Sequence, residues 1–245
     1  MARELFRETL PNGNLIVSVV SEIEDGDFSA NETRNRSLKE NQSKLRNGEW
    51  NWLSQEHGTE IIWLDEHERT FGDAGDALGT SSSQKVLAIT VADCLPLLLM
   101  EEGGILTLVH LGWRGIEQGL LEKTIKFIKT KSNEPISAVL GPCINSCCYE
   151  FGHDEMDNLV AKYGHKIVSK TLTGTLSLDM KECVREILNT YDVEIKYDDP
   201  FCTNCDPHHW SFRADGTDKR QVLIAWKEEN DGRLWKNEVF LHRRD

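Results

Sequence analysis

Three nearly continuous apolar segments in the middle of the chain constrain its fold more than any other feature. They cover residues 86–91, 95–100 and 105–109, and the turn-forming stretch 101–104 separates the last two. Each segment is as short as a β-strand. An unbroken apolar strand buries both of its faces, whereas a strand with one face in solvent alternates apolar and polar residues. We therefore predict a sheet that is covered on both sides.

Patterns typical of helices accompany these strands. Apolar residues recur at helical spacing across residues 116–130, and further helices are predicted at 154–163 and 179–191, the last with Ser177 or Asp179 as its cap. A short helix is expected near residues 36–45, and other strands are expected at residues 14–19, 61–64, 136–140, 195–197 and 222–226. Residues 66–85 are rich in Gly, Asp and Ser and predict a long connection.

Helical and strand patterns are mixed along all 245 residues, and no repeat, low-complexity tract or linker interrupts them. The simplest account is one α+β domain over residues 1–245, with a mixed central sheet flanked by helices.

The charge of the chain excludes several classes of partner. The 28 Lys and Arg residues are outnumbered by 41 Asp and Glu residues, which gives a net charge of −13. Proteins that coat nucleic acid or bind membrane surfaces need clustered positive charge, so we expect neither partner. The apolar segment 95–100 is far too short to span a membrane, and the first ten residues lack the apolar core of a secretory signal.

The seven cysteines indicate the redox environment. An odd number cannot pair completely within one chain, and together with the missing secretory signal this predicts a reducing, cytoplasmic location. The cysteines are then expected to be free thiols, core residues or metal ligands. Nothing in the sequence indicates an oligomeric state.

Three residues near the predicted strand ends suggest a metal site. His57, Cys94 and His110 each lie beside small or turn-forming residues. Imidazole nitrogen and thiolate sulfur suit Zn²⁺, and three protein ligands leave a fourth position for water or substrate, which is the catalytic arrangement. The spacing of the three matches no local metal motif, so each residue is also explained as a core or surface residue.

Two other uses of the cysteines remain open at this point. A cysteine hydrolase would use Cys94 as nucleophile with His110 and Asp93 as helpers, although Asp93 and Cys94 would face opposite sides of a regular strand. A structural zinc site would combine the pair Cys202 and Cys205 with the cluster at 143–148, although the spacing of that cluster is not typical of a zinc knuckle.

A small anionic ligand would require arginine in spite of the acidic charge. Arg36, Arg114, Arg213 and Arg220 are the candidates, because guanidinium binds phosphate in bidentate fashion. Arg114 is the most suggestive, since it lies at the start of a predicted helix, where anions are attracted.

Several short motifs follow one another in order along the chain. They are 35–36 (NR), 55–58 (QEHG), 75–80 (GDALGT), 92–96 (ADCLP), 110–115 (HLGWRG), 141–150 (GPCINSCCYE), 202–203 (CT) and 211–213 (SFR). In this order they resemble the motifs of the laccase-domain family. This family was long described as multicopper polyphenol oxidases and is now regarded as zinc-dependent purine nucleoside phosphorylases with adenosine deaminase activity.

The resemblance implies that His57, Cys94 and His110 bind one catalytic zinc ion. It also implies an α+β fold with a sandwich-like mixed sheet, similar to the catalytic domain of a bacterial cytotoxic necrotising factor. The chain departs from the family pattern at Glu56, at Leu111 and in the late basic segment 213–220. The three ligand positions are kept.

The resulting hypothesis is a phosphorylase for adenosine, inosine, guanosine and methylthioadenosine that also deaminates adenosine. Arg36 and Arg114 are expected to hold phosphate, and Asp93 is expected to act as general acid/base or to orient a ligand histidine. Cys94 and His110 are expected to be catalytic through the metal, which activates water for attack on adenine.

Two alternatives accompany this hypothesis. A copper-dependent polyphenol oxidase (laccase) also uses a site with two histidines and a cysteine, but its complete copper set needs about ten histidines, and this chain has eight. A non-enzymatic interaction protein would hold a structural metal or none.

Overall fold

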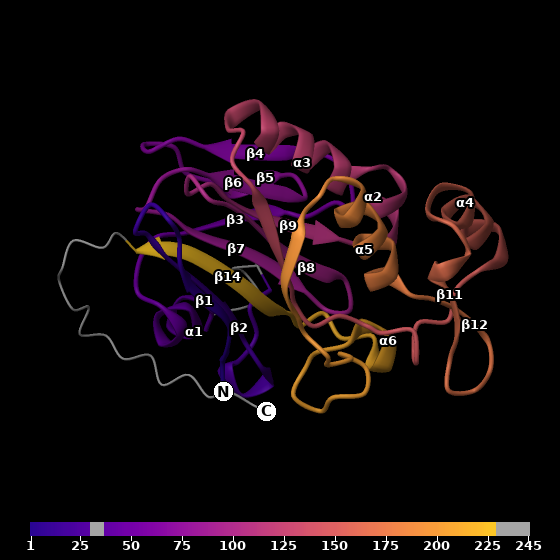
Figure 1. Cartoon of the computed structure of the whole chain (residues 1–245). Coiled ribbons are helices and arrows are strands. Elements are labelled where there is room, and N and C mark those ends of the chain that lie inside the picture. Colours follow the sequence, from indigo (N-terminus) through magenta and orange to yellow (C-terminus); the bar gives the residue numbers. More distant parts are fainter. Residues whose placement is uncertain (30–36, 229–245) are drawn as a thin grey trace.

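Two six-stranded sheets with helices outside them form the protein in its computed structural model, which describes residues 1–29 and 37–228 (Figure 1). The first sheet has the order β1-β2-β14-β7-β3-β5. Its strands are β1 (Arg3–Thr9), β2 (Leu15–Val20), β14 (Gln221–Glu228), β7 (Val86–Val91), β3 (Trp50–Ser54) and β5 (Phe71–Ala74). The pairs β1–β2, β2–β14 and β14–β7 are antiparallel, whereas β3 pairs in parallel with both of its neighbours, β7 and β5.

The second sheet has the order β13-β10-β8-β9-β6-β4 and is also mixed. Its strands are β13 (Glu194–Asp198), β10 (Ile136–Leu140), β8 (Leu95–Glu101), β9 (Leu106–Leu111), β6 (Ala77–Thr80) and β4 (Ile61–Leu64). The outer pairs β13–β10 and β6–β4 are parallel, and the inner pairs are antiparallel. A separate hairpin consists of β11 (Val168–Lys170) and β12 (Leu176–Leu178).

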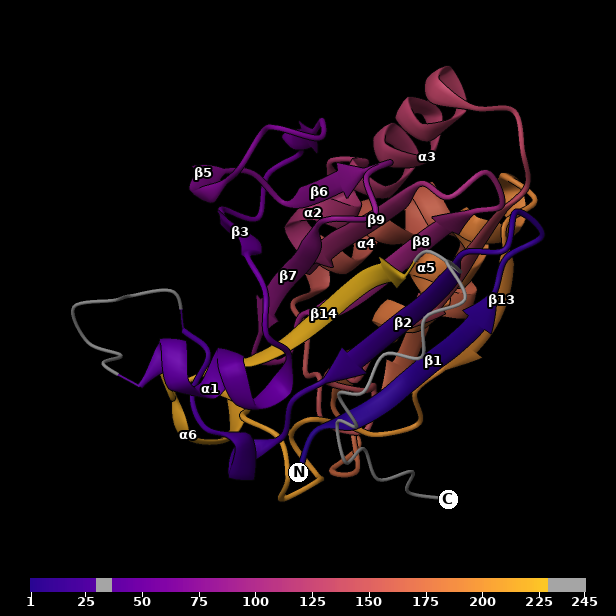
Figure 2. The same cartoon turned by 90° about the vertical axis from the view of Figure 1, so that its left-hand side faces the viewer.

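Helices cover the outer faces of the two sheets. Helix α1 (Leu38–Leu45) lies against the first sheet and the remaining long helices lie behind the second (Figure 2). These are α3 (Leu120–Lys131), α4 (His153–Tyr163) and α5 (Met180–Thr190). Shorter helices are α2 (Trp113–Glu117), α6 (Phe212–Asp215) and the 3₁₀ turns η1 (Ile23–Asp25) and η2 (His165–Ile167).

Strand β8 shows how the sequence specifies these layers. Its residues Leu95, Leu97 and Leu99 face the apolar cluster shared with the helices. Leu98 and Met100 face the cluster between the two sheets, where they meet Leu87 of β7. The strand has no polar face because both sides are covered. The predicted doubly covered sheet and α+β class are therefore confirmed.

The structure corrects several predicted elements. The helix expected at 116–130 is two helices, α2 and α3, separated at Gly119, whose φ of 83° is left-handed. The connection expected at 66–85 contains β5 and β6. Strand β1 was not predicted, because four of its seven residues are charged, including the buried Arg3. Predicted strands at 61–64 and 136–140 are confirmed as β4 and β10, and Asp179 caps α5 by accepting a hydrogen bond from the Glu182 amide.

Candidate metal centre

His57, Cys94 and His110 converge although they come from three separate elements. Their ligand atoms all lie within 4.8 Å of one another. The His57 Nε2 and Cys94 Sγ atoms are 3.5 Å apart, and the two imidazole centroids are 4.8 Å apart. Zinc–nitrogen and zinc–sulfur bonds of about 2.0 and 2.3 Å at tetrahedral angles require about 3.5 Å between such ligand atoms. The spacing of His57 and Cys94 therefore suits one shared zinc-sized ion, and the third ligand lies within reach of it.

Each ligand is placed by local backbone geometry. His110 is buried in β9, directly opposite Pro96 of β8. Cys94 closes the tight bend between β7 and β8, and His57 lies in the loop after β3 with a left-handed φ of 58°. His57 is the most accessible of the three. One side of the site is therefore open to a small molecule.

Asp76, immediately before β6, organises two of the ligands. Its buried carboxylate accepts hydrogen bonds from the backbone N–H groups of Glu56, His57 and Gly58, at 3.2, 3.0 and 2.7 Å. Its Oδ1 also lies 2.8 Å from His110 Nδ1. A carboxylate only accepts, so Nδ1 carries the proton and Nε2 is left for the metal. No role for Asp76 is predicted from the sequence, although its place in the motif at residues 75–80 (GDALGT) is a signal that could have found it.

Gly112 leaves the space in which the ligands meet. A Cβ at this position would lie 2.5 Å from His57 Cδ2 and 3.3 Å from Cys94 Sγ. The backbone φ of Gly112 is ordinary, at −79°. Glycine is therefore required here by the close approach of the ligands and not by backbone conformation.

The ligands shift one another's proton affinities. Burial alone would raise the pKa of the Cys94 thiol, but the charge of His110 and hydrogen bonds from both histidines lower it to about 6. Burial alone would lower the pKa of His110, but the charge of Cys94 and the hydrogen bond to Asp76 raise it to about 9. Without metal the pair is thus thiolate and imidazolium, and a metal ion would displace the imidazolium proton.

The Asp93 carboxylate forms no hydrogen bond with the side chains of His57, Cys94 and His110. Its φ of 88° is left-handed, and its carboxylate accepts from the Thr203 hydroxyl and the Arg213 backbone N–H, both at 2.7 Å. Its own carbonyl accepts from the Ile144 N–H at 2.9 Å. The carboxylate that orients a ligand histidine is Asp76, whereas Asp93 anchors the bend that carries Cys94.

The predicted phosphate ligands have different positions. Arg114 is exposed on α2, two residues from Gly112, and its guanidinium lies over the Trp113 ring at 4.4 Å. Arg36 lies outside the described residues. Arg213 donates to the Glu150 carbonyl and Arg220 to carbonyls of its own turn.

The model of one protein family matches residues 17–228 of the chain, and its description is multi-copper polyphenol oxidoreductase laccase. The chain belongs to this laccase-like family. Curated relatives are named purine nucleoside phosphorylase. One from Mycobacterium tuberculosis is 29% identical over 180 residues, covering 72% of each chain. Another from Xylella fastidiosa is 32% identical over 185 residues, covering 71% of each chain.

Two solved structures have the same fold as this chain. A Neisseria meningitidis protein described as DUF152 superimposes with a TM-score of 0.72 at 24% identity, covering 91% of this chain and 98% of its own. YlmD of Geobacillus stearothermophilus gives 0.70 at 22% identity, covering 89% and 93%. Both matches extend over nearly the whole of this laccase-like chain.

Membership of the laccase-like family and the converging ligands together indicate a metal at this centre. Among the described residues, this is the only candidate metal group that contains histidine. A trinuclear copper cluster would need further histidines close together. No helix in the described part of the chain is long and apolar enough to cross a membrane.

Proposed function

We propose that the whole chain is a single-domain, zinc-dependent purine nucleoside phosphorylase in the cytoplasm that also deaminates adenosine. The observation that carries the proposal is the convergence of two imidazole nitrogens and one thiolate, with one side open. Three ligands with an open position are typical of catalytic zinc. The printed names of the curated relatives supply the substrate class, a nucleoside with phosphate.

The reaction exchanges the base of the nucleoside for phosphate. Orthophosphate attacks the ribosyl C1′ atom, the glycosidic bond breaks, and the purine leaves with its electron pair and takes up a proton. When bound, zinc supplies Lewis-acid chemistry that polarises a ligand atom or activates water for deamination. The chain must hold phosphate, stack the base and keep the two reactants in line.

Residues beside the centre are suited to these tasks. Arg114 is our proposed phosphate ligand, together with Arg36. Trp113 and Phe151 meet edge to face with centroids 5.4 Å apart, which gives a purine an aromatic surface to contact. Tyr149 lies next to Phe151. Burial and the neighbouring Cys94 charge raise the pKa of Tyr149, so its hydroxyl stays protonated as a donor.

We assign Asp93 an indirect role in this reaction. Both of its carboxylate oxygens accept hydrogen bonds, from Thr203 and Arg213, so it positions the bend before Cys94. Cys94 and His110 act as metal ligands, and His57 completes the set.

A substrate panel tests the proposal. Metal-replete protein should release hypoxanthine from inosine only when phosphate is present, and should release ammonia from adenosine without phosphate. The Cys94→Ala variant should lose both activities, whereas Cys183→Ala, which changes a buried cysteine of α5, should keep them. Absence of both products from the wild type would refute the proposal.

One observation favours a second candidate, a cysteine hydrolase. Cys94, His110 and Asp76 form a thiolate–imidazolium–carboxylate series. Asp76 would then be the orienting acid, in place of Asp93. Activity that survives removal of metal and is abolished by alkylation of Cys94 would identify this function. Stoichiometric copper with a thiolate charge-transfer band would instead identify the copper oxidase.

A further inference from the structure

Four other cysteines meet on the two loops whose residues Thr203 and Ile144 contact Asp93. Strands β10 and β13 are parallel neighbours, so the loops that follow them leave the same edge of the sheet. The backbones of Cys143 and Cys202 form an isolated parallel β-bridge that extends this pairing; both thiols are free. The Thr203 N–H donates to the Cys143 carbonyl at 3.0 Å. One loop carries Cys147 and Cys148 after this point, and the other carries Cys202 itself and Cys205.

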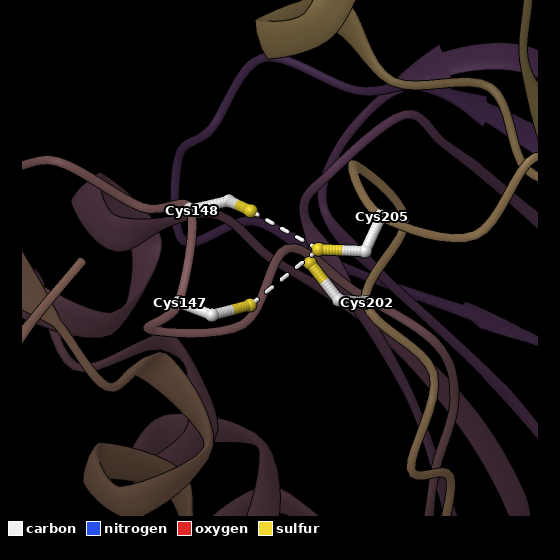
Figure 3. Close-up of side chains that lie close together, drawn as sticks. All are labelled: Cys147, Cys148, Cys202 and Cys205. Atoms are coloured by element: carbon white, nitrogen blue, oxygen red, sulfur yellow. Dashed lines mark hydrogen bonds between the residues drawn. The ribbon is translucent and has the colours of Figure 1, made fainter. Parts of the chain in front are cut away.

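The four sulfur atoms form a compact cluster. All lie within 4.8 Å of one another, and Figure 3 shows the four side chains directed toward a common centre. Cys205 Sγ is 3.7 Å from Cys147 Sγ and 3.2 Å from Cys148 Sγ. Zinc–sulfur bonds of about 2.3 Å place tetrahedral sulfur ligands about 3.8 Å apart. The observed spacing is therefore close to that of a four-thiolate zinc site.

We propose that Cys147, Cys148, Cys202 and Cys205 bind a second ion, Zn²⁺, at a structural site. Four protein ligands fill a tetrahedral shell and leave no position for a substrate, so this site has no catalytic role. Thiolate ligands without imidazole or carboxylate select zinc over harder cations. Cys143, considered with this set in the sequence, lies outside the cluster and is fully buried beside Asn145.

Backbone geometry supports metal binding at this cluster. The Asn145 N–H donates to Cys202 Sγ at 3.3 Å, a contact that stabilises a thiolate. The N–H groups of Cys205 and Asp206 both donate to the Cys202 carbonyl, at 3.0 and 2.9 Å. This tight turn directs both cysteines of the Cys-x-x-Cys pair to the same side. The two loops are joined further by the side-chain amide of Asn145, whose Nδ2 donates to the Pro200 carbonyl at 3.2 Å.

The proposed ion would also stabilise the first metal centre. Thr203, between two of the proposed ligands, donates to the Asp93 carboxylate, and Ile144, from the other loop, donates to the Asp93 carbonyl. Asp93 immediately precedes Cys94. An ion that joins the two loops would therefore fix both Thr203 and Ile144. These two residues hold the bend that carries Cys94, a ligand of the first centre.

Zinc content tests the proposal. Wild-type protein purified under reducing conditions and saturated with zinc should retain about two ions per chain after desalting. Cys205→Ser should retain about one, and since Cys205 is exposed the change leaves the core intact. His57→Ala should also retain about one, at the cysteine site, whatever the activity of the protein. Cys183→Ala removes a buried cysteine outside the cluster and should keep both ions.

A thiol count and a cobalt spectrum test the proposal in two further ways. Thiol titration after denaturation with a chelator should find all seven cysteines reactive. Two fewer would show that a disulfide occupies the cluster, and would overturn the proposal. Replacement of zinc by Co²⁺ in His57→Ala should give strong sulfur-to-cobalt charge-transfer bands that Cys205→Ser reduces. A His57→Ala protein that retains no zinc, although all thiols of the wild type are reactive, would also overturn it.

Discussion

The carboxylate of Asp76 lies 2.8 Å from Nδ1 of His110, and it also accepts hydrogen bonds from the loop that carries His57. One buried side chain therefore sets the orientation of two metal ligands that are far apart in the sequence. Cys94 is fixed separately, through the bend anchored by Asp93. The centre thus depends on two carboxylates, neither of which is itself in the ligand set.

Replacement of Asp76 by Asn should weaken zinc binding about 10- to 100-fold, because the amide is a poorer acceptor for the loop N–H groups and no longer fixes the imidazole tautomer. Competition with a chromophoric chelator measures the affinity. Asp73→Asn is the control, since Asp73 is exposed on β5. Equal zinc affinities for Asp76→Asn and wild type would show that the hydrogen bond does not orient His110.

Gly112→Ala should abolish metal binding while the protein remains folded. The added methyl group would lie 2.5 Å from His57 Cδ2, and the exposed loop of His57 can move away more easily than β9. Gly115→Ala is a matched control, because its nearest neighbour would be the Gly58 carbonyl at 3.4 Å. Zinc content and circular dichroism decide the outcome. Full zinc occupancy in Gly112→Ala would mean that the ligands are not held as closely as described.

Asp198 at the end of β13 should make stability depend on acid pH. Burial alone would raise the pKa of Asp198, but Lys181 at 2.8 Å and Arg185 at 2.5 Å lower it. A lowered carboxyl pKa contributes stability above the unfolded value of about 4, and this contribution is lost as the pH falls through the folded value.

Asp198→Asn should therefore reduce the free energy of unfolding by about 2 kcal/mol at pH 7, with the difference from wild type shrinking below about pH 4. Urea unfolding at several pH values measures this. Asp192→Asn changes an exposed residue with a left-handed φ of 56°, which asparagine tolerates, and should show no such trend. A difference independent of pH would assign the effect to packing.

The sequence predicts those parts of the fold whose apolar pattern is strong. Strands β7, β8 and β9 are recognisable because each is buried on both faces. Strand β5 is not, since all four of its residues are exposed and their composition is that of a loop. The break at Gly119 is invisible because the apolar spacing continues across it.

The functional site is predictable to a smaller extent. His57, Cys94 and His110 are candidates by residue type, but their convergence depends on the pairing of β8 with β9 and on the loop held by Asp76. The cysteine cluster depends on the parallel pairing of β10 with β13. That pairing brings Cys202 beside Cys143 and leaves Cys147 and Cys148 to face Cys205, an arrangement that sequence spacing does not reveal.

Asp93→Asn distinguishes a positioning role from acid–base catalysis. Because Asn has only one acceptor oxygen, the variant keeps one of the two hydrogen bonds at most, and we expect a loss of about 1–3 kcal/mol in unfolding free energy. If Asp93 only anchors the bend, zinc affinity and kcat should fall together while the pH profile of kcat keeps its shape. Thr203→Val, which removes one donor to Asp93, should show the same pattern to a lesser degree. If Asp93→Asn instead removed either the acidic or the basic side of the pH dependence of kcat and left zinc affinity unchanged, Asp93 would be the general acid or base.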